Sequence, residues 1–174
     1  DSFTAVPSFT EVGTYEVSYT VSKHGYNDVT GSYTFEIVKG DITGFEIEAN
    51  ESVVYDGEDH ESATVTVGVP ADAKITFFHG DKEYIDVPEF TDAGIYTISY
   101  IISKEGYNDV TGEYTFEIVK GDITGYEVKA NDAVKYDGTA KVSAAVTVGV
   151  PADAKITYTC NGEDYDDVPA FVDA

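Results

Sequence analysis

Few side chains in this sequence belong to the types that perform catalysis, and these few are widely separated. The titratable and nucleophilic candidates near neutral pH are His24, His60, His79 and Cys160. A catalytic site needs such groups to converge with neighbours that tune them. No motif of serine hydrolases, zinc proteases, phosphate-binding loops or paired-cysteine metal sites occurs. We therefore predict no enzyme activity, and no catalytic, cofactor-binding or metal-binding residues.

Carboxylates are the other groups that could do chemistry. Asp166 and Asp167 form a pair of the kind that glycosidases use, but neighbouring residues of a strand point to opposite faces. The acidic run DGEDHE at Asp56–Glu61 suggests calcium, yet no calcium-loop pattern of alternating Asp or Asn occurs. Calcium binding is therefore the weaker alternative to a plainly acidic surface.

Covalent cross-linking by a Lys–Asn isopeptide bond is a further alternative. Lys39 and Lys120 continue the inward-facing pattern of a predicted strand, and the bond requires that they point inward at its end. Two pairs of asparagines recur with them, Asn27 with Asn108 and Asn50 with Asn131. We favour the simpler interpretation, in which the lysines reach solvent and the asparagines form turns.

The sequence repeats itself with a fixed offset. GYNDVTG stands at Gly25–Gly31 and again at Gly106–Gly112, and 106 − 25 = 81. VTVGVPADAKIT at Val65–Thr76 recurs at Val146–Thr157 with the same offset. The overlaid copies agree at roughly 60% of positions, which predicts a tandem array of small domains. Each histidine faces a different residue type in the other copy (Glu105, Lys141 and Cys160), so none belongs to a repeated site.

Composition and charge exclude several partners. The chain has 33 acidic residues against 10 lysines, a net charge of −23 and a pI near 4.1. Nucleic acids and anionic membranes attract basic surfaces, so we predict no nucleic-acid partner and no membrane insertion. A soluble extracellular surface fits this composition. Because the chain begins within a repeat and without Met, we expect it to be a segment of a longer protein.

Val, Ile, Thr, Tyr and Phe dominate the sequence, which favours strands over helices. One unit alternates between strand patterns and turn signals about every ten residues, which predicts an all-β, antiparallel sandwich of about seven strands. The expected strand segments are Phe45–Asn50 with Ser52–Gly57 as one split strand, Ser62–Val69, Lys74–Phe78, Tyr84–Phe90, Gly94–Ser103 and Glu113–Lys120.

One segment carries a more specific resemblance. TDAGIYTISY at Thr91–Tyr100 resembles the entry to strand F of immunoglobulin-like domains. The resemblance implies a tyrosine corner at Tyr96 and Tyr15, in which the hydroxyl bonds back to a nearby backbone group. Ile98 and Val17 stand where antibody domains have cysteine, so the core must hold without a disulfide.

The whole unit, with YDG, DAGxYT, GYNDVTG and FEIVKGDITG, is similar to the YDG/MBG-type immunoglobulin-like repeats of mostly Gram-positive bacterial surface proteins. This resemblance implies a structural stalk, spacer or fibre-forming segment of an extracellular adhesin. Its partners would be other copies of itself, or a glycan or host-surface ligand. The alternative is a carbohydrate-binding or accessory module of a large secreted glycan-degrading protein, with sugars stacked on exposed aromatic rings.

The repeat frame predicts three domain segments. Residues 41–121 form one complete repeat, residues 1–40 end a preceding repeat, and residues 122–174 begin a following one. Each partial repeat should expose half a core, and each supplies the strands that the other lacks. We expect head-to-tail assembly by strand complementation. The alternative is that the domain edges lie elsewhere, near Gly80–Asp81. The loop GYNDVTG is expected to be a turn joining the sixth and seventh strands, with Tyr26 and Tyr107 pinning it in place.

Overall fold

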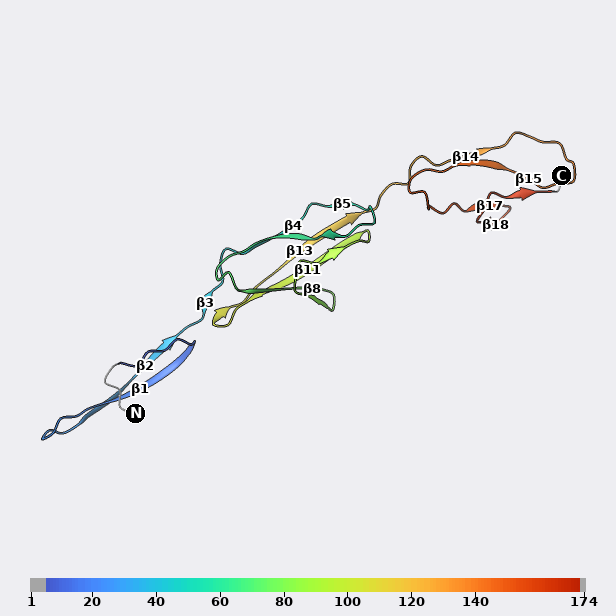
Figure 1. Ribbon diagram of the computed structural model, residues 1–174. Coiled ribbons are helices and arrows are strands. Elements are labelled where there is room, and N and C mark those ends of the chain that lie inside the picture. Colours follow the sequence, from blue (N-terminus) through green and yellow to red (C-terminus); the bar gives the residue numbers. More distant parts are fainter. Residues whose placement is uncertain (1–5, 173–174) are drawn as a thin grey trace. The chain divides into compact units, whose positions relative to one another are not determined.

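The computed structural model describes residues 6–172 and is all-β, with no helix in that range (Figure 1). The chain divides into two compact units, Asp1–Lys120 and Gly121–Ala174. In the first unit we call β1 and β2 the head hairpin and residues 40–120 the middle repeat. Residues 121–172 are called the tail unit.

The head hairpin consists of β1 (Gly13–Val21) and β2 (Val29–Ile37), paired antiparallel along their whole length. The strands of the middle repeat are β3 (Gly40–Asp41), β4 (Glu46–Ala49), β5 (Val53–Val54), β6 (His60–Glu61), β7 (Ala63–Thr66), β8 (Lys74–His79), β9 (Lys82–Tyr84), β10 (Glu89–Phe90), β11 (Gly94–Ser103), β12 (Tyr107–Asn108) and β13 (Val110–Val119). One sheet has the order β5-β13-β11-β8-β9, while β4 pairs with β7 and β6 with β10.

The core of the middle repeat lies between the five-stranded sheet and the β4–β7 ladder. Inward-facing residues of both layers meet there, and the buried cluster comprises Ala63, Phe77, Phe90, Ile98, Tyr114, Phe116 and Ile118. Ile47 and Val65 of the smaller layer pack against this cluster. Strand alternation explains the pattern, because Ile98 and Phe116 point inward while Thr97 and Glu117 are exposed.

Two expectations for the strands are confirmed. β11 has the predicted bounds, Gly94–Ser103. The first strand is split as expected, because β4 pairs with β7 whereas β5 joins β13 in the other sheet. The β5–β13 pair is parallel, which the prediction of a purely antiparallel sandwich did not include. The chain crosses from one layer to the other between Ala49 and Val53, where it leaves the antiparallel partner β7 and joins the parallel partner β13.

The prediction for GYNDVTG was wrong in its second half. Residues from Val110 onward already belong to β13, and Gly112 lies opposite Tyr100 in the ladder. A Cβ at Gly112 would stand 2.4 Å from the Tyr100 hydroxyl oxygen. This glycine is therefore required by the neighbouring ring and not by a turn.

The tail unit contains β14 (Glu127–Ala130), β15 (Lys141–Val142), β16 (Ala144–Thr147), β17 (Tyr158–Cys160), β18 (Glu163–Tyr165) and β19 (Ala170–Phe171). They form three two-stranded ladders, β14–β16, β15–β19 and β17–β18. Residues 155–157 are not in a strand, although their counterparts 74–76 pair with β11. Within residues 121–172 no strand corresponds to β11, and residues 155–157 have no ladder partner there.

Candidate functional site

The loop before β13 contacts Gly40–Asp41, the segment that leads from the head hairpin into the middle repeat and that we call the linker. β12 in the loop pairs in parallel with β3 in the linker. The Gly40 N–H donates to the carbonyl of Gly106 at 2.9 Å, and the Asn108 side-chain amide donates to the Asp41 carboxylate at 2.9 Å. These contacts join residues that are far apart in the sequence. We call this arrangement the clasp.

Tyr107 completes the clasp. A Cβ on Gly40 would lie 2.9 Å from the Tyr107 ring, so only glycine lets the linker approach this closely. The loop itself is closed by the Tyr107 N–H, which donates to the Lys104 carbonyl at 3.0 Å. In the head hairpin, the equivalent Tyr26 is exposed and lies under the Lys23 ammonium group. Tyr107 thus packs against Gly40, whereas Tyr26 is exposed among residues 6–172.

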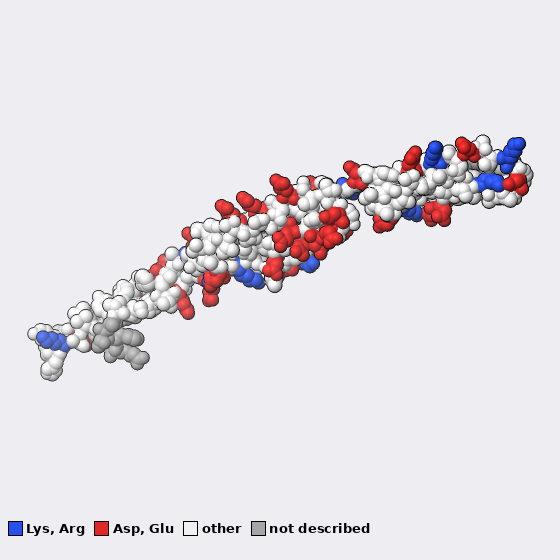
Figure 2. Space-filling model, turned by 45° about the horizontal axis from the view of Figure 1, so that its top comes forward, with Lys and Arg blue, Asp and Glu red and all other residues white. Residues whose placement is uncertain are grey.

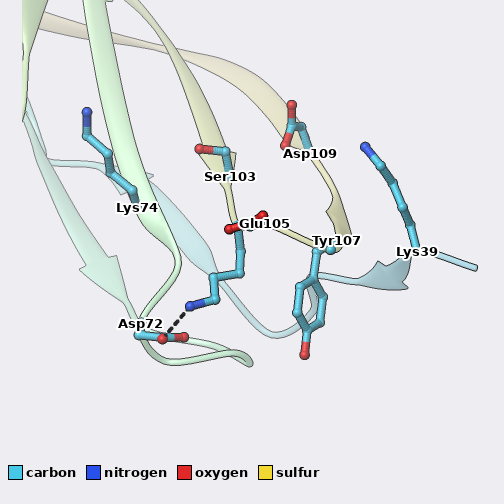
Figure 3. Close-up of a pocket in the computed structure, with 9 residues that line it drawn as sticks. Lys39, Asp72, Lys74, Ser103, Glu105, Tyr107 and Asp109 are labelled. Atoms are coloured by element: carbon cyan, nitrogen blue, oxygen red, sulfur yellow. Dashed lines mark hydrogen bonds and ion pairs between the residues drawn. The ribbon is translucent and has the colours of Figure 1, made fainter. Parts of the chain in front are cut away.

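An ion pair borders the clasp. Lys104 Nζ lies 2.5 Å from Asp72 Oδ2, which the dashed line in Figure 3 marks. The hydrogen bond from Lys104 lowers the pKa of Asp72, and the same bond raises the pKa of Lys104. The pair lies in an open hollow that Lys39, Lys74, Glu105 and Asp109 also line, with Lys39 and Lys74 on opposite sides (Figure 3). Charges of both signs meet here, so the hollow does not favour one sign of ligand.

The head hairpin presents an open apolar face. Its register repeats that of β11 and β13, with Gly13 opposite Ile37 as Gly94 is opposite Ile118. Phe35 is 47% exposed, whereas its repeat equivalent Phe116 is 1% exposed. The same contrast holds at other inward-facing positions of the hairpin, which are Tyr19, Val21, Val29 and Tyr33.

The tail unit presents the complementary open face. Phe171 is 42% exposed against 9% for its equivalent Phe90, and Ile123 is 64% exposed against 6% for Ile42. Phe90 stacks on Tyr96 of β11, and residues 121–172 contain no counterpart of that tyrosine. The strands that the tail unit lacks are those that the head hairpin contains.

The two predicted tyrosine corners are confirmed. The Tyr96 hydroxyl donates to the Asp92 carbonyl at 2.6 Å, and the Tyr15 hydroxyl donates to the Glu11 carbonyl at 2.7 Å. Tyr96 stacks on Phe90 with ring centroids 3.8 Å apart. Burial raises the pKa of Tyr96, and the charge of Asp92 adds to the rise.

A buried polar contact joins the two layers of the core. The Ser62 hydroxyl donates to the Pro88 carbonyl at 2.7 Å, so the Tyr114 hydroxyl, 2.9 Å away, must donate to Ser62. Burial raises the pKa of Tyr114, and the contact with Ser62 opposes part of that rise. This contact needs both β13 and the segment before β7.

The histidines and the cysteine do not converge. His60 pairs with Asp56 at 2.9 Å, and Lys141 takes the same role beside Asp137 in the next copy. Asp56 also accepts the Glu58 backbone N–H, which is the main cause of its lowered pKa. His79 packs its ring edgewise against Phe90 and Tyr96, and Cys160 is a free thiol in the tail unit.

The structure locates the other groups considered from sequence. Asn50 and Asn131 donate to the backbone carbonyls of Glu61 and Val142, as structural asparagines do. Lys39 and Lys120 are exposed, in agreement with the favoured interpretation that these lysines reach solvent. Asp166 forms an ion pair with Lys155 at 2.8 Å.

Residues 6–172 contain no group of three or more His, Cys, Asp or Glu side chains that could hold a metal ion. Within the same range, no helix has the length and apolar character needed to span a membrane. Acidic side chains are spread over the visible surface and outnumber the lysines (Figure 2).

For glycan stacking, the shared exposed aromatic residues of the YDG motif are Tyr55 and Tyr136. One tyrosine per copy offers a face for a single sugar ring, so a carbohydrate site stays a prediction. Comparison with known proteins adds no further candidate, because no family model, curated protein or solved structure matches this chain.

Proposed function

We propose that this chain is a structural tandem-repeat segment, a stalk or spacer, of a bacterial extracellular surface or adhesin protein. Its units are immunoglobulin-like sandwiches of about seven strands, divided as residues 1–40, 41–121 and 122–174. The observation that carries the proposal is the clasp, because a repeat that grips its own incoming linker restricts movement between neighbouring units. A spacer requires such a restriction.

The tyrosine corner and the two-layer core support the immunoglobulin-like assignment. Ile98, at the position where antibody domains carry a disulfide cysteine, is fully buried among Phe77, Tyr114 and Phe116. Apolar packing thus takes the place of the cross-link. The excess of carboxylates supports an extracellular location, where a self-repelling surface prevents association through unspecific contacts.

The clasp and the core together suit a mechanical role. Force applied along the chain acts on the middle repeat at β3 and at the end of β13, and the parallel β5–β13 pair ties the start of the repeat to its final strand. Separating these strands requires hydrogen bonds and apolar contacts to break together. A unit built this way extends little until it unfolds as a whole.

Single-molecule pulling on the full chain between two handle proteins tests this proposal. We expect one cooperative unfolding step from the middle repeat, which releases roughly 280 Å of chain less its folded span. Asn108→Ala should soften the chain before that step and leave the released length unchanged. A smooth extension without any such step would contradict a spacer role.

A further inference from the structure

The five-stranded sheet of the middle repeat has an open edge at β9, which among the described residues pairs only with β8. A two-residue turn joins these strands, so the closing pair His79 and Lys82 shares backbone hydrogen bonds. Glu83, one residue further along β9, therefore directs its N–H and C=O groups away from β8. Free backbone groups of this kind are those with which an added strand pairs.

A groove of about 410 Å³ follows this edge and is lined by residues 83–89. Two of its apolar residues, Tyr84 and Val87, are half-buried and pack against the core cluster. A third, Ile85, is 71% exposed although it lies between them in the sequence. The groove thus offers apolar surface directly beside the free backbone groups of β9.

The groove is fixed at both ends by the fold of the middle repeat. At one end Tyr84 lies opposite Phe77 in the β8–β9 ladder. At the other end the carbonyl of the buried Pro88 accepts the Ser62 N–H at 3.1 Å and the Ser62 hydroxyl at 2.7 Å. Residues 85–88 belong to no strand. Because its ends are held, the groove loses little conformational entropy when a partner binds.

Charge defines the kind of partner that fits the groove. Three exposed carboxylates, Glu83, Asp86 and Glu89, lie along it, and within residues 6–172 none of them forms an ion pair. The neighbouring Lys82 is held over the ring of Tyr84, with its Nζ 4.4 Å from the ring centroid. A basic partner is therefore attracted, whereas a second copy, with its net charge of −23, is repelled.

We infer that the β9 edge binds an extended basic segment of a different protein, in which an apolar side chain stands between Lys or Arg residues. The backbone of this segment pairs with Glu83, its apolar side chain covers Ile85, and its basic side chains meet the three carboxylates. This docking site goes beyond the proposed spacer function and does not depend on it, because a spacer needs only contacts along its own chain.

The tail unit provides a natural contrast. Its β17–β18 hairpin has the same register as β8–β9. However, Asp166 stands in the place of Ile85 and forms an ion pair with Lys155, and Ala170 stands in the place of Glu89. The apolar contact and two of the free carboxylates are thus missing from this copy. We expect the basic segment to bind the middle repeat and not the tail unit.

Fluorescence anisotropy of the full chain with a labelled, capped peptide, Lys-Val-Lys-Ile-Lys-Val-Lys, tests the inference. We expect saturable binding that weakens as salt is added, and no binding of the acidic peptide Glu-Val-Glu-Ile-Glu-Val-Glu. Ile85→Ser should weaken binding of the basic peptide at least about fivefold by removing the apolar contact. Its matched control, Ile95→Ser, changes a residue of similar exposure (69%) outside the groove and should leave binding unchanged.

Two further variants separate backbone pairing from charge. Glu83→Gln removes one carboxylate and keeps the N–H group, whereas Glu83→Pro removes both. Since this N–H group is not used in the β8–β9 ladder, proline is compatible with the strand, and near-UV circular dichroism checks the fold. Glu83→Pro should bind the basic peptide about fivefold more weakly than Glu83→Gln.

Three results would overturn the inference. The first is no binding of the basic peptide at about 1 mM. The second is equal binding by Ile85→Ser and Ile95→Ser, and the third is equal binding by the two Glu83 variants. Either equality would mean that the peptide is held only by general attraction to an acidic chain. None of these results alters the cooperative unfolding step that tests the spacer function, so the two proposals fail separately.

Discussion

The head hairpin and the β11–β13 hairpin have nearly the same sequence and the same strand register, yet they differ in burial. The alternating pattern is sufficient to form the two-stranded ladder in both places. Burial of its inner face requires the opposite layer, which packs on β11–β13 in the middle repeat and is absent beside the head hairpin among residues 6–172. The comparison separates what the local sequence determines from what the completed sandwich adds.

The largest difference is expected at the centre of the core. Phe116→Ala removes a buried ring from between the two sheets and should lower the free energy of unfolding by about 3–5 kcal/mol. The equivalent Phe35→Ala changes an exposed ring and should lower it by less than about 1 kcal/mol. Urea unfolding at low protein concentration measures both. Equal losses at the two positions would remove the distinction between closed and open copies.

The equivalent glycines Gly112 and Gly31 test the same comparison by adding a side-chain atom instead of removing a ring. Gly112→Ala places a methyl group against the half-buried Tyr100 and should destabilise the middle repeat by about 1–3 kcal/mol. Gly31→Ala meets Tyr19 at a similar distance, but that ring is exposed and can rotate away. Thermal unfolding of the two variants, monitored by near-UV circular dichroism, should show a shift only for the first. A comparable shift in both would mean that Tyr19 is as constrained as Tyr100.

The buried hydroxyl contact gives a smaller effect. Tyr114→Phe leaves Ser62 bonded to Pro88 and removes one donor, which should cost about 1 kcal/mol. Tyr33→Phe is the matched control in the head hairpin and should be neutral in dilute solution. Chemical denaturation of each variant against the parent chain provides the measurement. A neutral Tyr114→Phe would show that the hydroxyl contact adds nothing to packing.

The smallest effect is expected at the exposed ion pair beside the clasp. The hydrogen bond from Lys104 lowers the pKa of Asp72 in the folded chain. The ion pair therefore stabilises the fold fully above pH 3.8, the ordinary pKa of Asp. This stabilisation is lost as the pH falls through the lower pKa that Asp72 has in the folded chain. Lys104 has a raised pKa, so its part persists below 10.5 and disappears at higher pH. Asp72→Asn should flatten the acid side of the stability profile. Asp153→Asn, at the unpaired equivalent within the described residues, should leave the profile of dilute chain unchanged.

Local patterns predicted much of the fold. The alternation of apolar and polar residues predicted the strand Gly94–Ser103 with its correct bounds. The DAG motif before Tyr96 predicted the hydrogen bond from the Tyr96 hydroxyl to a nearby backbone group. The clasp was not predicted, because GYN and KGD both resemble ordinary turns and only their meeting in space gives them a role. Asn108 and Asp41 are separated by 67 residues, and the alternation of residues along a strand does not predict a contact over that distance in sequence. Their joint recurrence as Asn27 and Asp122 was the available signal.

Amide hydrogen exchange tests most directly whether the opposite layer closes the fold, because it measures the head hairpin and the β11–β13 hairpin in one dilute sample. Peptides from the head hairpin and from β11–β13 differ in sequence, for example at Glu16 and Thr97, so mass spectrometry distinguishes them. We predict that the β11–β13 amides exchange at least about a hundredfold more slowly than their equivalents in β1 and β2. Equal exchange rates in the two hairpins would contradict the claim that the opposite layer, and not the local sequence, closes the fold.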